Sequence, residues 1–316
     1  MILIYSNDID FATTKVLEWI DSHGKNFIRV NNGNLIETNN FSFAINNHEN
    51  KLKVNDVEVT SYWYRRSKVP APKIGDKKWN LSLKYSINNH LKTELIALNN
   101  GIAACSKKIK SLSHPLTAKS EKINDLIEAT NVGLSIPPSL VTNKKSELLK
   151  FVNKHNSVIV KNIGNALPHY INNMNYTTYT SIIDKKDIVQ YPEKIFPGMF
   201  QKKINKEFEL RTFIIDRNIY SAAIFSQQNE ETSIDFRKYS SVKPNRIVPY
   251  KLPDEIEKKL LLLMENLKLN TGSIDLIRYE DDFIFLEINP VGQFGWISTP
   301  CNYCIEKIIA EYIIES

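Results

Sequence analysis

Hydrophobic residues near the amino terminus change from a strand-like period to a helical one and back. Residues 2–5 and 27–30 are short runs of apolar and β-branched side chains, which predict buried strands. Between them, apolar residues at helical spacing predict an amphipathic helix whose stripe faces inward. The stripe comprises Val16, Leu17, Trp19 and Ile20. A strand, a helix and a strand in this order favour an α/β lobe with a parallel sheet.

Strand-like periods continue after this lobe begins, and a helical period follows them. Hairpin strands are predicted at residues 41–45, 51–54 and 57–59, and a further strand runs into an aromatic segment. Residues 81–100 then predict a helix. Its apolar positions are Leu83, Ile87, Leu91, Leu95 and Leu98. We expect the first lobe to end near residue 114.

Helical and strand-like patterns alternate through the remainder of the chain. Helices are predicted at 119–131, 147–155, 252–267 and 302–314, and strands at 139–142, 158–161, 197–204, 207–213 and 220–225. The first of these helices is expected to bury Ile123, Leu126, Ile127 and Ala129. The pattern predicts an α/β protein, and its length suits two or three lobes.

A predicted hairpin near the carboxyl terminus carries the best candidate for chemistry. Two apolar runs, residues 272–277 and 284–289, are joined by a polar turn. Side chains alternate along a strand, so Glu287 and Asn289 share a face, and Asp275 on the partner strand can share it too. These oxygen ligands suit Mg²⁺, which keeps several waters and is often shared with substrate phosphates. The alternative is that both carboxylates merely flank a solvated hairpin.

Cationic residues follow several predicted strands. Arg65 and Arg66 come directly after aromatic residues at a strand end, where they either hold a carboxylate or phosphate or form a surface charge. Glu209 and Arg211 share one face of a strand, where on the residues alone they would form a cross-strand salt bridge of little value if exposed. Lysines such as Lys161 at the end of a strand are typically exposed.

Composition limits the class of protein. A chain of 316 residues is long for one domain, and its net charge of +6 is too small to indicate nucleic acid. No apolar run is long enough to predict a transmembrane helix, and no signal-peptide pattern is present, so we expect a cytoplasmic protein without a membrane partner. Cys301 and Cys304 form an isolated pair that indicates small residues at a helix start, not a zinc site.

The segment after the second hairpin strand also resembles a known family. Residues 285–293 read Phe-Leu-Glu-Ile-Asn-Pro-Val-Gly-Gln, and with Asp275 before them they resemble the metal-binding core of the ATP-grasp ligases. They are most similar to the graspetide (microviridin-type) peptide maturases of the grasp-with-spasm branch. Residues 62–66 resemble the Trp-Tyr-Arg-Arg segment of these maturases, and residues 233–239 resemble their Asp-aromatic-Arg segment.

The resemblance implies an ATP-grasp fold and a set of site residues. Residues 1–114 would form a pre-ATP-grasp lobe, 115–196 a central lid subdomain, and 197–316 a subdomain with the metal site. Metal ligands are implied at Asp275, Glu287 and Asn289, and nucleotide contacts at Lys122, Lys161, Gln201, Lys202, Ile204, Glu207 and Glu209. Catalytic or substrate contacts are implied at Arg211, Arg237, Arg65 and Arg66. The lid loop departs from many ATP-grasp enzymes, because Gly164 is its only glycine.

The implied activity is ATP-dependent ligation within a peptide. Asp or Glu side chains of a ribosomal precursor peptide would be activated as acyl phosphates and joined to Thr, Ser or Lys side chains. The implied cofactors are ATP and Mg²⁺, and the implied partners are a precursor peptide with a leader and an acidic, Thr-rich core, and a second copy of the chain in a homodimer. Two alternatives remain: a glutamate or small amino-acid ligase, and a non-catalytic ATP-binding regulatory protein.

Overall fold

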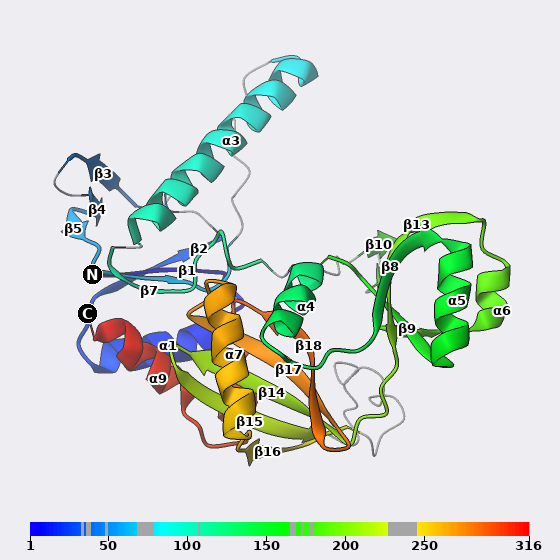
Figure 1. Ribbon diagram of the computed structural model, residues 1–316. Coiled ribbons are helices and arrows are strands. Elements are labelled where there is room, and N and C mark those ends of the chain that lie inside the picture. Colours follow the sequence, from blue (N-terminus) through cyan, green and yellow to red (C-terminus); the bar gives the residue numbers. More distant parts are fainter. Residues whose placement is uncertain are drawn as a thin grey trace. The chain divides into compact units, whose positions relative to one another are not determined.

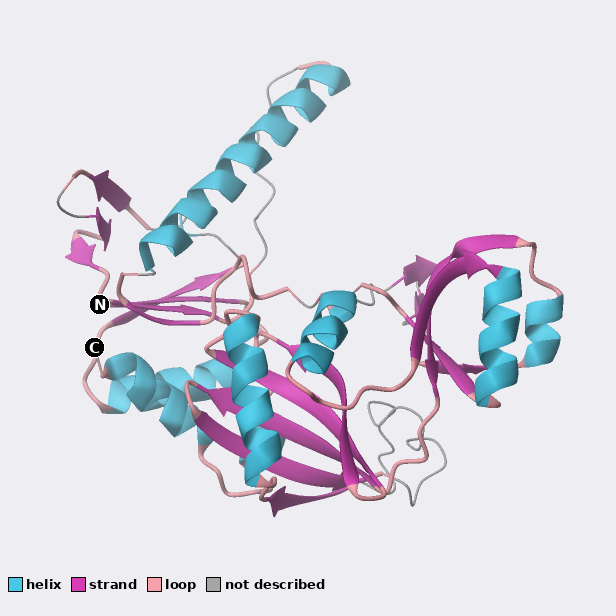
Figure 2. Cartoon of the chain, viewed as in Figure 1, coloured by secondary structure: helices cyan, strands magenta, loops and turns pink. Residues whose placement is uncertain are grey.

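The computed structural model describes residues 1–32, 35, 39–47, 50–67, 79–106, 108–119, 121–164, 169–171, 174–176, 180–226 and 245–315. The chain forms two compact units, drawn in Figures 1 and 2. The first comprises Met1–Lys119, Leu269–Gly272 and Pro290–Ser316, and the second comprises Ser120–Lys268 and Ser273–Asn289. The division into three parts stays a prediction.

The first unit contains a parallel four-stranded sheet in the order β2-β1-β6-β7. Its strands are β1 (Ile2–Ser6), β2 (Phe27–Asn31), β6 (Ser61–Tyr64) and β7 (Lys110–Leu112). Helix α1 (Phe11–Ser22) connects β1 and β2, so the predicted strand-helix-strand start is confirmed. The predicted hairpins are confirmed as β3 (Phe41–Ile45), β4 (Asn50–Val54) and β5 (Val57–Glu58).

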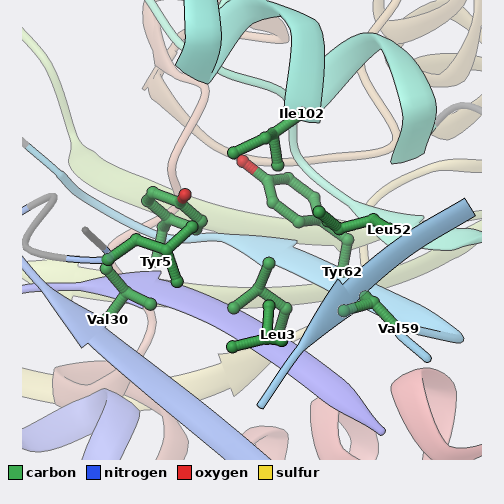
Figure 3. Close-up of a cluster of buried hydrophobic side chains, with 9 residues drawn as sticks. Leu3, Tyr5, Val30, Leu52, Val59, Tyr62 and Ile102 are labelled. Atoms are coloured by element: carbon green, nitrogen blue, oxygen red, sulfur yellow. The ribbon is translucent and has the colours of Figure 1, made fainter. Parts of the chain in front are cut away.

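Apolar side chains from this sheet and the hairpins form one core. Figure 3 shows Leu3, Tyr5 and Tyr62 in contact with side chains from the neighbouring elements. The predicted helix at 81–100 is confirmed within α3 (Leu81–Ser106), which contributes Ile102 to this core, with Leu98 packed against it. Leu83 and Leu91, nearer its start, are exposed.

Two further helices of the first unit come from the carboxyl terminus. These are α8 (Gly295–Ser298) and α9 (Ile305–Ile314), and α9 packs against α1. Val16, Leu17 and Ile20 of α1 are buried as predicted, but Trp19 is 39% exposed. The prediction for Trp19 is wrong because its ring lies at the edge of the helix pair, under the ammonium group of Lys307.

Among the described residues, the second unit contains two larger sheets and one two-stranded hairpin. An antiparallel sheet in the order β12-β9-β13-β8 comprises β8 (Ser139–Lys144), β9 (Val158–Lys161), β12 (Ser181–Ile183) and β13 (Lys194–Lys202). It packs against α5 (Lys145–His155) and α6 (Lys185–Val189) through Leu148, Val152, Ile188 and Phe200. Strands β10 (His169–Ile171) and β11 (Met174–Tyr176) form a separate hairpin.

The other sheet of the second unit has five strands in the order β16-β15-β14-β17-β18. These are β14 (Phe208–Ile215), β15 (Asn218–Phe225), β16 (Arg246–Tyr250), β17 (Thr271–Tyr279) and β18 (Asp282–Asn289). Helix α4 (Lys122–Asn131) contacts β18 and α7 (Asp254–Asn266). No helix within the described part of the chain combines the length and the apolar character needed to cross a bilayer.

Helix α4 buries a different face from the one that its apolar residues predict. Leu126 and Ala129 are buried, but Ile123 is 41% exposed and Ile127 is 53% exposed. Asp125 is buried with only 4% exposure. It lies three residues after Lys122 and therefore on the same face of the helix, and this is the face that meets β18. The prediction that Ile123 and Ile127 face inward is therefore wrong, and a carboxyl group occupies the buried stripe.

The Asp125 carboxyl group is in an unfavourable place for a charge. Burial, with further contributions from the charges of Glu121 and Glu287, raises its pKa from 3.8 to about 6, and a backbone hydrogen bond at Glu121 opposes this shift. Its Oδ2 atom has no hydrogen-bond partner among the described residues. The ionised form therefore destabilises the fold at neutral pH.

We predict that Asp125→Asn becomes more stable relative to the wild type as pH rises. The folded state retains the Asp125 proton between pH 3.8 and about 6, where the unfolded chain has released it, so wild-type stability falls across this window. The variant should gain on the order of 2–3 kcal/mol between about pH 4 and about pH 7. Urea unfolding without nucleotide or metal measures this difference, and a difference that is constant with pH would contradict the prediction.

Candidate active site

The β17–β18 hairpin places two carboxylates opposite each other. Its strands form as predicted, and Asp275 is the register partner of Glu287. Residues directly opposite in an antiparallel pair point to the same face, so both carboxylates lie on one side of the sheet. The register shifts after this pair: the partners of Asp275 and Leu276 on β18 are separated by one extra residue, which forms a bulge. Asn289 lies two residues beyond Glu287 and shares its face.

Each of these carboxylates has a cation beside it. Arg211 on the adjacent strand β14 donates from Nη1 to Asp275 Oδ1 at 2.6 Å, and both side chains are largely buried. Lys122, at the start of α4, has its Nζ 3.8 Å from Glu287 Oε2. A buried carboxylate without a cation would be strongly destabilising, so the fold itself supplies the positive charge that this face requires.

A second buried ion pair lies further along the same sheet. Lys206 and Glu209 are 8% and 7% exposed at their side chains, and the lysine donates to the carboxylate. Glu209 and Arg211 are two residues apart on β14 and share a face, as the sequence predicts. Sequence reasoning missed Lys206. The available signal was its spacing: Lys206 lies three residues before Glu209, whose side chain points inward because side chains alternate along the strand.

The result is a row of charged side chains on and beside one sheet of the second unit, in which a cation flanks each end of the facing carboxylate pair. In spatial order along these pairs, the row comprises Lys206, Glu209, Arg211, Asp275, Glu287 and Lys122. This arrangement places carboxylates that could bind a metal ion beside Lys and Arg side chains that could bind phosphate groups. That these groups bind a magnesium nucleotide stays a prediction.

The residues present fit a magnesium ion. Asp275, Glu287 and Asn289 offer two carboxylates and an amide oxygen, which are hard ligands of the kind that Mg²⁺ prefers. Within the described ranges, no group of three or more His, Cys, Asp or Glu side chains is arranged to hold a metal. A site with two carboxylates suits an ion that shares its remaining positions with water and substrate phosphates.

Several residues expected to contact the nucleotide lie on two neighbouring strands of the smaller sheet. Lys161 ends β9, and it is the register partner of Met199 on β13, the strand that also carries Gln201 and Lys202. Lys122 donates from Nζ to the carbonyl of Asn162 at 3.2 Å. This hydrogen bond joins the start of α4 to the end of β9, so Lys122 lies close to the segment that carries Lys161.

Other predicted nucleotide residues have roles within the fold. Gln201 is buried, and its Nε2 donates to Ser139 Oγ at 2.9 Å. Ile204 follows β13, and the backbone amide of Glu207 donates to the carbonyl of Arg278 at 2.8 Å. These contacts fix the connection between the two sheets of the second unit. Their roles toward a nucleotide stay predictions.

The two adjacent arginines after β6 are in different environments. Arg65 is 3% exposed and donates from Nη1 to the carbonyls of Val291 and Gly292, within the first unit. Arg66 is half-buried, and its guanidinium has no hydrogen-bond or ion-pair partner among the residues that the structure describes. Arg237 lies outside the described residues, as does part of the predicted lid loop at 162–180.

Among known proteins, the chain matches solved structures only. No protein-family model matches the chain, and no curated protein sequence matches it. A RiPP-associated ATP-grasp ligase from Chryseobacterium gregarium, solved with ADP and a leader and core peptide, is 27% identical with a TM-score of 0.79. The similarity covers 99% of this chain and 94% of that one.

Two further solved structures are similar over nearly their whole length. The macrocyclase MdnC from Microcystis aeruginosa, bound with the precursor peptide MdnA, is 25% identical with a TM-score of 0.77 and full coverage of both chains. The ATP-grasp ligase PsnB, complexed with a minimal precursor, Mg and ADP, is 17% identical with a TM-score of 0.77, covering 99% of this chain and 96% of that one. These similarities confirm both the ATP-grasp fold and the resemblance to the graspetide-type peptide maturases that the sequence predicts.

Proposed function

We propose that this chain is an ADP-forming ligase that crosslinks side chains of a ribosomally made precursor peptide. The observation that carries this proposal is the facing pair Asp275 and Glu287, flanked by Arg211 and Lys122. The pair lies in a fold shared with ligases solved in complex with ADP and peptide. Two carboxylates and two cations on one face are the groups that phosphoryl transfer requires.

The reaction begins with activation of a peptide carboxylate. An oxygen of an Asp or Glu side chain attacks the γ-phosphorus of ATP, the bond to the β–γ bridging oxygen breaks, and ADP leaves. Asp275, Glu287 and Asn289 would hold Mg²⁺, which would supply positive charge to the phosphate oxygens. Arg211 and Lys122 then have phosphate oxygens in place of these carboxylates as partners, and they stabilise the charge that develops.

The second step forms the crosslink. A Thr or Ser hydroxyl, or a Lys amine, attacks the acyl carbon, inorganic phosphate leaves, and the nucleophile loses its proton. The peptide therefore loses one water for each linkage, and one ATP becomes ADP and phosphate. Exclusion of bulk water from the acyl phosphate favours this transfer over hydrolysis.

Arg66 is the described arginine best suited to hold the peptide carboxylate. The carboxylate must approach the γ-phosphate, and a guanidinium beside it offsets the repulsion between the two anions. Arg65 uses its guanidinium for contacts within the fold, whereas that of Arg66 has no partner in the described part of the chain. The homodimer and the cytoplasmic location stay predictions.

The proposed function is tested by mass spectrometry of a candidate precursor after incubation with the protein, ATP and Mg²⁺. We expect the peptide mass to fall by one water per linkage, with one ADP formed for each. An unmodified precursor together with consumption of free glutamate or another small amino acid would indicate an amino-acid ligase. Nucleotide binding without turnover of either substrate would indicate a regulatory protein.

Replacement of the facing carboxylates should abolish ligation without unfolding the protein. We expect Asp275→Asn and Glu287→Gln each to lower the ligation rate at least 10²- to 10³-fold, by order of magnitude, because each removes charge that binds the metal. Asp281→Asn, in the exposed turn of the same hairpin, is the matched control and should leave the rate unchanged. Near-normal turnover of either site variant at saturating ATP and Mg²⁺ would contradict the metal assignment.

Replacement of Arg66 should separate peptide activation from nucleotide binding. We expect Arg66→Ala to slow single-turnover ligation by roughly 30- to 150-fold, because one charge-assisted hydrogen bond to the peptide is lost. ATP affinity, measured by calorimetry, should stay close to that of the wild type. Arg217→Ala, in the exposed turn between β14 and β15, controls for loss of an arginine elsewhere. Normal ligation by the Arg66 variant would show that Arg66 is a surface charge and does not hold the peptide.

A further inference from the structure

Arg65 joins three segments of the first unit at the end of β6. Its Nη1 atom donates to the carbonyls of Val291 and Gly292, which follow the second hairpin strand in the chain. Its Nε atom is 3.2 Å from Asp10 Oδ2, and its guanidinium lies 5.0 Å from the centre of the Phe294 ring. A planar group with several fixed donors can hold partners in different directions at once.

The partners of Arg65 are themselves constrained. Asp10 is the amino-terminal cap of α1, where its Oδ1 accepts from the backbone amide of Thr13 at 3.2 Å. Gly292 has a φ of +62°, a conformation that favours glycine, and it allows two successive carbonyls to converge on one nitrogen. The loop at 291–294 is therefore shaped to receive a guanidinium.

Removal of this guanidinium would leave buried groups without their partner. Asp10 is 8% exposed, so its carboxylate would lose its cation in a place that water hardly reaches. The carbonyls of Val291 and Gly292 would lose a charged donor, and Phe294 would lose a cation above its ring. Residues 291 and 292 belong to no helix or strand, so their carbonyls depend on contacts such as these.

This loop begins two residues after the end of β18. Glu287 and Asn289 lie on β18, Pro290 follows them directly, and Arg65 holds the chain at Val291 and Gly292. The last residues of a strand are the part that frays unless they are tied down. An anchor at this point limits how far Asn289 and Glu287 can move.

We propose that Arg65 is a positioning residue that fixes the loop at 291–294 and thereby the end of the strand that carries Glu287 and Asn289. Its guanidinium acts on protein groups, in contrast to the substrate contact that the sequence implies for both arginines of the pair. Successive residues at a strand end point to opposite faces, which explains how Arg65 is buried while Arg66 is half-buried. The metal part of this proposal rests on the proposed function.

The test combines amide hydrogen exchange with Mg²⁺-dependent nucleotide binding in the full-length protein. Arg65→Ala should exchange at least about tenfold faster at residues 291–294 without any nucleotide present, because charge-assisted bonds worth a factor of this size are lost. It should also bind ADP with Mg²⁺ about tenfold more weakly. Arg65→Lys, which keeps the charge but not the fork, should lie between the two proteins.

Two further variants keep the proposal testable if Arg65→Ala does not fold. Asp10→Asn retains a capping side chain for α1 but removes the ionic partner of Arg65, so it should show the same changes to a smaller extent. Arg217→Ala, in the exposed turn between β14 and β15, is the control and should leave both exchange at residues 291–294 and Mg²⁺-dependent affinity unchanged.

Unchanged exchange at residues 291–294 in Arg65→Ala would overturn the proposal, as would normal exchange and affinity combined with lost peptide ligation. The latter result would make Arg65 a substrate contact. Absence of Mg²⁺-dependent nucleotide binding in the wild-type protein would instead defeat the proposed function, while the exchange measurement would still test the anchor.

Discussion

The pairing of β17 with β18 is the constraint on which the rest of this site depends. The register sets Asp275 directly opposite Glu287, and two like charges at this distance repel unless cations lie beside them. The protein meets this requirement from two directions, with Arg211 on the neighbouring strand and Lys122 at the start of a helix. The positions of β14 and α4 are therefore electrostatically linked to the hairpin.

Under the proposed function, the same cations would allow one protein face to receive both a metal ion and phosphate groups. Without ligands, each carboxylate is neutralised internally by a lysine or an arginine. A magnesium nucleotide brings its own positive and negative charges, so the carboxylates and cations can take external partners without leaving a buried charge unpaired. Asp125 adds a cost to this arrangement, since its carboxyl group is buried close enough to Glu287 for that charge to raise its pKa.

Local features of the fold could be predicted from the sequence, and features that depend on long-range pairing could not. The hairpin, its facing carboxylates and the strand-helix-strand start all follow from periodicity over a few residues. The contact of Arg211 with Asp275 depends on which strands become neighbours in the five-stranded sheet, which periodicity does not encode. Helix α4 misled the prediction because Ile123 and Ile127 are apolar, whereas the charge of Glu287 draws Lys122 and its face of the helix inward. The different environments of Arg65 and Arg66 likewise depend on the distant loop at Gly292.

Transfer of the γ-phosphoryl group to a peptide carboxylate is the central claim, and an oxygen label follows it most directly. A precursor whose Asp and Glu side chains carry ¹⁸O would be converted in unlabelled water with ATP and Mg²⁺, and the inorganic phosphate would be analysed by mass spectrometry. Attack of the carboxylate on phosphorus, followed by cleavage of the acyl carbon–oxygen bond, places one ¹⁸O atom in phosphate for each linkage formed. Phosphate without the label, or formation of AMP and pyrophosphate in place of ADP, would contradict the account.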